Sequence, residues 1–244
     1  MKLEVKNLEK KFNNFTAVNS INFEIGDGQT LGLLGPNGCG KTTTIGMLLG
    51  LIKPTNGKIL INNEDLESLN REKVLENVNF ASPYVELPKK LTVKENLEIY
   101  ARLYGIKDLK NRILEISEDL GLNPFINKKT GELSSGQKNR VSLAKSLINK
   151  PKILFLDEPT ASLDPDIGDF VRGYIENYKS KNKVSILLAS HNMKEVERLC
   201  DQVIMMKNGS IVDSGTCHSL IQKHGRNNLE DTFLKIARNK NELV

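Results

Sequence analysis

The chain has 244 residues, of which 39% are apolar and 27% are charged, a balance that is typical of a globular protein and excludes wholesale disorder. Its net charge is +5, from 35 basic and 30 acidic residues. This is not the clustered basic footprint of a dedicated nucleic-acid binder, so we expect no nucleic-acid partner. Cys39, Cys200 and Cys217 are too few and too scattered for a disulfide framework or a metal site, which indicates a reducing compartment.

Neither a secretion signal nor a membrane span is expected. The N-terminal stretch MKLEVKNLEKKF lacks the apolar core of a signal peptide. No apolar run approaches the roughly 20 residues that a membrane-spanning helix needs. Any action at a membrane would therefore require a partner.

The predicted elements begin with two alternating stretches, KLEVKN and SINFEI, which are typical of edge or half-buried strands. Short apolar runs then alternate with helical patterns: TLGLLG before a helix over 41–50, KILI after it, KILFLD at 152–157 and VSILLAS at 184–190. Continuous apolar runs of this kind indicate strands covered on both faces, hence a parallel α/β core. Between about residues 84 and 150 the period is helical, which predicts a helical insertion, and the tail from residue 216 is helical in pattern too.

The segment GPNGCGKTT lies between a predicted strand and a predicted helix and matches the pattern G-x-x-x-x-G-K-[ST] in full. In this motif, glycines let backbone amides wrap a phosphate, the lysine reaches the β- and γ-phosphates, and the hydroxyl after it binds Mg²⁺. The alternative is a glycine-rich turn with an incidental lysine. The predicted phosphate loop comprises Gly35, Pro36, Asn37, Gly38, Cys39, Gly40, Lys41, Thr42 and Thr43.

Two further strands end in polar side chains. Asp157 ends the run ILFLD and Glu158 follows it. Phosphoryl transfer needs a carboxylate for Mg²⁺, which Asp157 fits, and a group that orients the attacking water, which Glu158 fits. Taken alone, the two acids could also be a charge pair at a helix N-terminus. His191 follows VSILLAS, and although a lone histidine is more often structural, ligands bind at the carboxyl ends of parallel strands. His191 is therefore a candidate γ-phosphate contact.

The stretch GELSSGQKNR, at 131–140, raises the question of a second anion site. Ser134 and Ser135 are good cap residues, and an amphipathic run follows them. A helix start presents unpaired amides and a partial positive charge, which suits a phosphate. By itself the stretch is either a well-capped helix start or an anion site.

Taken in order, these motifs resemble those of the ATP-binding cassette (ABC) ATPases: the loop at 35–43, LSSGQ at 133–137, ILFLDEPT at 153–160, SLD at 162–164 and His191. The resemblance covers nearly the whole chain. It implies that Glu158 and His191 are catalytic, that Phe12 stacks on adenine, and that Asp164 lies in a loop communicating between protomers. It also implies a signature motif that contacts the ATP of a partner protomer, formed by Ser134, Ser135, Gly136 and Gln137.

The implied fold is a P-loop NTPase core with a mostly parallel sheet, an N-terminal antiparallel β subdomain and an inserted helical subdomain. Within a single ABC ATPase domain over 1–244, we expect the core at 1–83 and 151–215, the helical subdomain at 84–150 and a C-terminal helical extension at 216–244. The implied cofactors are ATP and Mg²⁺, with Thr42 and Asp157 as metal ligands.

A finer resemblance, to the ATPase subunits of ABC-2 type exporters, lies in ENLEIYARLYGI, SHNMKEVERLCDQVIMMKNGSIVDSG and NLEDTFLKIAR. It implies a homodimer with a second ABC ATPase protomer, an integral membrane permease as a separate partner, and a cytoplasmic location on the inner face of the cell membrane. The alternative is a soluble ABC ATPase without a permease, of the translation, ribosome or DNA-repair type. Proteins of that soluble class usually have two cassettes in one chain or a long coiled coil. A third class, a regulatory nucleotide binder that does not hydrolyse ATP, is disfavoured because Glu158 and His191 are both present.

The sequence departs from the family at one position. Family members usually carry a glutamine after the strand that precedes the helical insertion, but this chain has none between Gln29 and Gln137. Aligned on LTV, the position falls near Ser82 or Pro83; a serine oxygen can bind water or Mg²⁺, whereas proline has no donor. Our hypothesis is that Ser82 takes the role of the missing glutamine.

Cys39, within the phosphate loop, has two alternative interpretations. It is either an inert small residue or a thiol whose pKa the helix-start amides lower.

Overall fold

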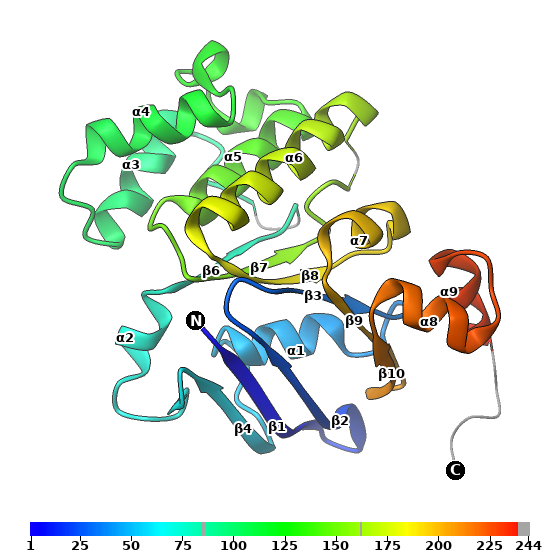
Figure 1. Cartoon of the computed structure of the whole chain (residues 1–244). Coiled ribbons are helices and arrows are strands. Elements are labelled where there is room, and N and C mark those ends of the chain that lie inside the picture. Colours follow the sequence, from blue (N-terminus) through cyan, green and yellow to red (C-terminus); the bar gives the residue numbers. More distant parts are fainter. Residues whose placement is uncertain (84–85, 162, 239–244) are drawn as a thin grey trace. The chain divides into compact units, whose positions relative to one another are not determined.

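The computed structural model describes residues 1–83, 86–161 and 163–238 (Figure 1). They form two compact units, Met1–Val74 with Ser185–Val244, and Leu75–Val184. The two units are considered separately below.

The first unit contains an antiparallel sheet in the order β2-β1-β4-β5. Its strands are β1 (Leu3–Phe12), β2 (Phe15–Ile25), β4 (Asn56–Ile61) and β5 (Glu64–Asp65). The alternation seen in the sequence places Leu3, Val5 and Leu8 on the buried face of β1. The central strand pairs on both sides, since Leu3 lies opposite Ile25 of β2 and Ile61 of β4.

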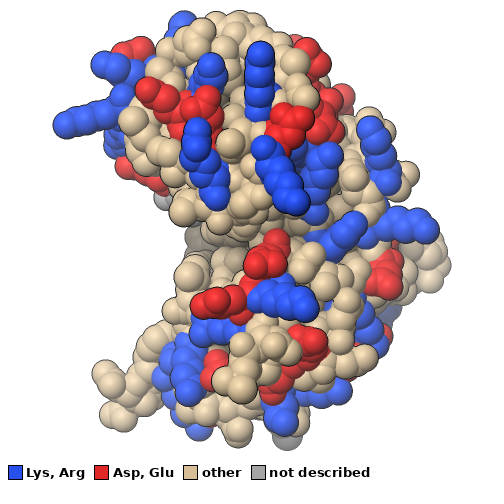
Figure 2. Space-filling view, turned by 90° about the vertical axis from the view of Figure 1, so that its left-hand side faces the viewer, with Lys and Arg blue, Asp and Glu red and all other residues tan. Residues whose placement is uncertain are grey.

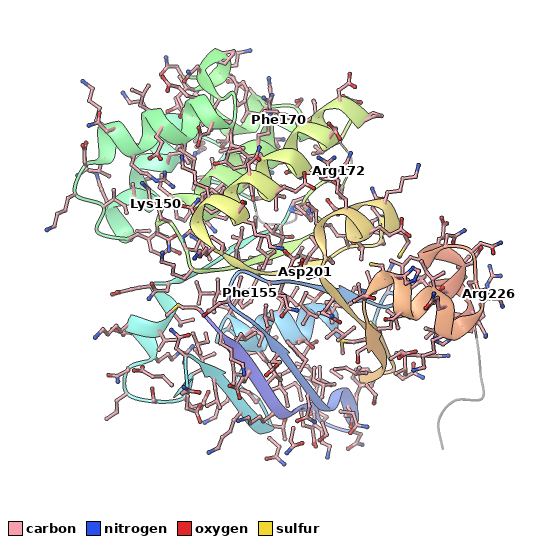
Figure 3. All side chains as sticks on the ribbon, viewed as in Figure 1. Lys150, Phe155, Phe170, Arg172, Asp201 and Arg226 are labelled. Carbon is pink, nitrogen blue, oxygen red and sulfur yellow. The ribbon has the colours of Figure 1, made fainter. Side chains whose placement is uncertain are left out.

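The same unit holds four strands in the order β10-β9-β3-β8. β3 (Thr30–Leu34) pairs in parallel with β8 (Ser185–Ala189) and β9 (Gln202–Lys207), and β10 (Ser210–Gly215) is antiparallel to β9. Every residue of β3 and β8 is buried, as their continuous apolar runs predict. The Asp201 carboxylate accepts a hydrogen bond from the Thr30 N–H at 2.7 Å and so joins the starts of β9 and β3 (Figure 3).

Five helices lie wholly or mostly in the part of this first unit that the structure describes. They are α1 (Lys41–Leu48), α2 (Arg71–Leu75), α7 (Met193–Leu199), α8 (Cys217–His224) and α9 (Leu229–Arg238). The two C-terminal helices lie beside β9 and β10 in Figure 1, where Leu220, Leu229 and Ile236 join one apolar cluster with Val203 and Met205 of β9. The last six residues of the predicted extension, 239–244, lie outside the described residues.

The second unit has one parallel strand pair, β6 (Val78–Ala81) with β7 (Ile153–Asp157), in which Phe155 is fully buried (Figure 3). Its α-helices are α3 (Val93–Leu103), α4 (Leu109–Asp119), α5 (Ser135–Leu147) and α6 (Pro165–Asn182), with 3₁₀ turns at Asn123–Phe125 and Thr130–Glu132. Thr92 and Glu95 form a reciprocal capping box at the start of α3, which fixes where that helix begins.

The predicted α/β class, with one antiparallel and one mostly parallel set of strands, is confirmed. Within the part of the chain that is described, no helix is long and apolar enough to cross a membrane. On the face drawn in Figure 2, basic and acidic side chains are interspersed.

Candidate functional site

Two glycines in the loop between β3 and α1, Gly35 and Gly40, leave no room for a side chain. Gly40 has φ +109°, and a Cβ there would lie 2.5 Å from the Ala17 carbonyl oxygen. A Cβ on Gly35 would lie 2.3 Å from the Cys39 Sγ atom, closer than any side chain tolerates. Both glycines are therefore required by the close approach of neighbouring atoms, and Gly40 is required by its backbone conformation as well.

Lys41 lies across this loop. Its Nζ atom donates hydrogen bonds to the carbonyl oxygens of Gly35 at 2.6 Å and Pro36 at 3.2 Å. The N-cap of α1, Gly40, offers no side chain to the first-turn amides. An ammonium group thus lies beside a helix N-terminus that has no side-chain cap, the combination that favours an anion.

The pKa of the Cys39 thiol is raised, not lowered as a reactive thiol would require. Its side chain is buried, and burial raises the pKa of the thiol; the neighbouring Lys41 acts in the opposite direction but is outweighed. Backbone N–H groups at the start of α1 also act to lower the pKa, but desolvation of the charged form outweighs them, so of the two alternatives the thiol with a lowered pKa is wrong.

His191 is placed at the same sheet edge as the phosphate loop. In the parallel pairing of β3 with β8, Leu33 lies opposite Ala189. Gly35 comes two residues after Leu33, and His191 comes two residues after Ala189. The His191 side chain is exposed, so it is accessible to a ligand at this edge.

Phe12 ends β1 and is 46% exposed. It lies opposite Phe15 across the hairpin, and the Lys10 ammonium lies 4.9 Å from its ring centroid. An exposed aromatic face of this kind can stack on a planar ring.

In the second unit, Asp157 and Glu158 follow the buried part of β7. Asp157 is half-buried, and Glu158 has φ +53°, a left-handed backbone that is uncommon for a residue with a side chain. Ala81 lies opposite Leu156 in the pairing of β6 with β7. Ser82 and Asp157 come next on their strands, so both lie at the carboxyl edge of this pair.

Ser82 is only 3% exposed, and its backbone oxygen accepts a hydrogen bond from the Ser142 Oγ atom of α5 at 3.3 Å. One turn further along α5, the Lys145 Nζ atom donates to the Phe80 carbonyl oxygen at 3.3 Å. The helix that begins in the signature stretch is therefore joined directly to the end of β6. Sequence reasoning missed both contacts, because nothing in the spacing pairs residues about 60 positions apart.

The signature stretch forms a capped helix start. The Ser134 Oγ atom accepts the Gln137 N–H at 3.2 Å, and the Gln137 side chain accepts the Ser134 N–H at 3.0 Å, a reciprocal capping box. Ser135 is exposed at the first helical position, while Gly136 is buried close to Ile167. The cap is thus present, and it leaves the Ser135 side chain at the surface.

The remaining motif, SLD, is described only in part. Asp164 is exposed and is the N-cap residue of α6, although its side chain makes no capping hydrogen bond. Ser162 lies outside the described residues. The first unit thus carries Phe12, the phosphate loop and His191, and the second carries Ser82, the signature stretch, the two acids after β7 and Asp164.

Comparison with known proteins gives consistent results. The family model described as "ABC transporter" matches residues 18–161. The chain is 36% identical over 222 residues to Nod factor export ATP-binding protein I of Burkholderia orbicola (strain AU 1054), covering 90% of this chain and 72% of that protein. A solved ATP-binding subunit of an ABC transporter superposes with a TM-score of 0.89 at 26% identity, covering 98% of this chain and all of that one. A dimeric ATP-binding cassette in a post-hydrolysis state with ADP and Pi gives 0.80 at 25% identity, covering 88% and 98% of the two chains.

Proposed function

The chain belongs to the ABC transporter family of ATP-binding, ATP-hydrolysing proteins with a P-loop NTPase fold, and we propose that it powers export of a substrate through a separate membrane permease. In this proposal it forms a homodimer around two MgATP molecules and acts on the cytoplasmic face of the cell membrane, held there by the permease. The similarity to a Nod factor export ATP-binding protein supports an export role. The dimeric cassette among the similar structures supports a second ATPase protomer.

The observation that carries the ATP-binding role is the phosphate loop. This loop combines two glycines that leave no room for a Cβ, a helix N-terminus without a side-chain cap and the Lys41 ammonium, and together these favour an anion. We assign ATP binding to residues 35–43, with Phe12 stacking on adenine and His191 contacting the γ-phosphate. The signature stretch, 134–137, would contact the ATP held by the partner protomer, where an exposed Ser135 at a helix N-terminus suits the γ-phosphate.

The donor chemistry fits Mg²⁺. Asp157 offers a half-buried carboxylate and Thr42 an exposed hydroxyl, and Mg²⁺ is usually held by one or two carboxylates together with the substrate phosphates. When bound, the ion would neutralise charge on the β- and γ-phosphates. Glu158 would orient the attacking water for in-line displacement, and Asp164 would respond to the partner protomer. These assignments draw on the whole domain over 1–244, with 84–150 as the helical subdomain and 216–244 as its extension.

Dimer formation tests the proposal. Glu158→Gln keeps the shape of the side chain but removes the charge that orients water, so with MgATP it should accumulate as a dimer on gel filtration. Lys41→Ala, which lacks the phosphate contact, should stay monomeric under the same conditions. A Glu158→Gln protein that remains monomeric at saturating MgATP would contradict the dimer model.

The proposed partnership with a permease is tested by co-purification. An integral membrane protein should co-purify with the full chain from detergent-solubilised membranes; recovery with ribosomes or DNA instead would favour the soluble alternative.

Ser82 lies at the carboxyl edge beside Asp157, where an oxygen can act on water or Mg²⁺. Ser82→Ala should therefore lower permease-coupled ATPase activity, and unchanged activity would remove Ser82 from the mechanism.

A further inference from the structure

The turn between β8 and α7 is built around a buried carboxylate that the proposed mechanism does not use. Only Ser190, His191 and Asn192 separate the strand from the helix. Ser190 is 2% exposed and Glu195, in the first turn of α7, is 1% exposed, whereas His191 between them points to the surface. A buried carboxylate is costly unless it is hydrogen-bonded, so its presence beside this turn calls for a partner.

The Ser190 hydroxyl is such a partner, and its contacts close into a ring. The Ser190 Oγ atom donates to the Glu195 Oε2 atom at 2.6 Å and accepts the Asn192 N–H at 3.1 Å. The Asn192 Oδ1 atom then accepts the Glu195 N–H at 3.4 Å and caps α7. The Ser190 hydroxyl thus donates its hydrogen to the carboxylate, and its oxygen stays available to accept the Asn192 N–H.

The ring fixes the backbone on both sides of His191. Residue 190 is held by the helix through Glu195, and residue 192 is held by residue 190 and by the helix start. β8 is itself paired with β3, the strand that leads into the phosphate loop. The ring therefore fixes the position of the imidazole relative to that loop.

We propose that Glu195 and Ser190 are positioning residues that hold His191 where it contacts the γ-phosphate. The inference rests on the role proposed above for His191. Positioning of this kind matters because a displacement of about 1 Å at a catalytic group can lower the rate by about 100-fold. Neither residue touches the nucleotide; both act through the turn that carries the imidazole.

The test uses steady-state ATP hydrolysis by the full chain. Glu195→Ala and Ser190→Ala should each lower kcat by about 10- to 100-fold while the KM for ATP changes little, because ground-state binding depends on the phosphate loop. Glu195→Gln and Ser190→Thr, which keep the acceptor and the hydroxyl, should recover most of the rate. Lys194→Ala, an exposed change on the same helix turn, is the matched control and should hydrolyse ATP normally.

A double-mutant comparison separates positioning from a merely structural role. If Glu195 acts through His191, adding Glu195→Ala to His191→Ala should cause no further loss of kcat, whereas independent effects would add. Additive losses, a parallel loss of ATP affinity, or failure of Glu195→Gln and Ser190→Thr to recover activity would overturn the inference. Native activity in His191→Ala would instead remove the proposed role of His191. If His191→Ala loses ATPase activity while Ser190→Ala and Glu195→Ala both keep native activity, the positioning inference is overturned and the proposed role of His191 stands.

Discussion

Gly40→Ala is predicted to damage the phosphate loop far more than Gly38→Ala. Both glycines have positive φ angles, +109° and +77°. They differ in the space around an added methyl group. At Gly38 no described residue other than its two chain neighbours lies within 4 Å, whereas at Gly40 the Ala17 carbonyl oxygen lies at 2.5 Å and the Val18 Cγ2 atom at 3.3 Å. The pair therefore separates backbone strain from steric overlap within one loop.

The expected loss of stability in each variant follows from backbone strain and steric overlap. A left-handed backbone costs an alanine about 1–2 kcal/mol, and both variants carry this cost. Overpacking adds about 1–3 kcal/mol at Gly40 alone, because the nearest atom belongs to the backbone of β2 and cannot rotate away. We expect Gly40→Ala to lower the free energy of unfolding by about 2–5 kcal/mol and Gly38→Ala by about 1–2 kcal/mol.

Thermal unfolding followed by far-ultraviolet circular dichroism measures the difference, since the chain has no tryptophan for fluorescence. For a chain of this size, each kcal/mol lowers Tm by about 2–4 °C. ATP affinity, measured by calorimetry on both variants below their Tm, should fall further for Gly40→Ala because the loop must shift. Equal Tm values for the two variants would refute the steric argument.

Three further predictions concern other parts of the site and fold. Ser134→Ala removes the cap of α5 and should lower the free energy of unfolding by about 0.5–2 kcal/mol, measured by urea unfolding, with Ser134→Asn largely restoring it. Cys39 should react with iodoacetamide more slowly than the two half-buried cysteines, because its burial limits access of the reagent; burial raises the pKa of the Cys39 and Cys217 thiols alike, so access decides between these two. Mass spectrometry at short times that finds Cys39 labelled first would contradict this. Burial raises the pKa of Asp213, but hydrogen bonds from Lys223 and His224 outweigh it, so the net pKa is lowered in the folded state. Its contribution to stability is present above the unfolded pKa of about 3.9 and lost as pH falls through the lower folded value, so Tm of Asp213→Asn should depend less on pH below about 4 than that of the native chain.

The local motifs were predictable from the sequence because each depends on neighbours in the chain. The match at 35–43, the acids after an apolar run and the cap residues at Ser134 all express chemistry that is complete within about ten residues. The alternation of apolar runs with helical periods was enough to predict an α/β class with a parallel core, since strands covered on both faces must be continuously apolar. The register of β3 with β8, which places the phosphate loop and His191 at one edge, follows the general rule for parallel sheets.

Tertiary structure decided the properties that depend on contacts between distant segments. The Cys39 thiol has a raised pKa because folding buries it, an effect that no spacing rule contains. The contacts of Ser142 and Lys145 with the end of β6 join residues about 60 positions apart, so they exist only once α5 has packed. The Glu195 carboxylate looks like an ordinary first-turn acid in the sequence; only its burial against Ser190 shows that it holds the turn that carries His191. Sequence therefore determines which groups are available for phosphate chemistry, while packing determines which of them are desolvated, paired and held in place.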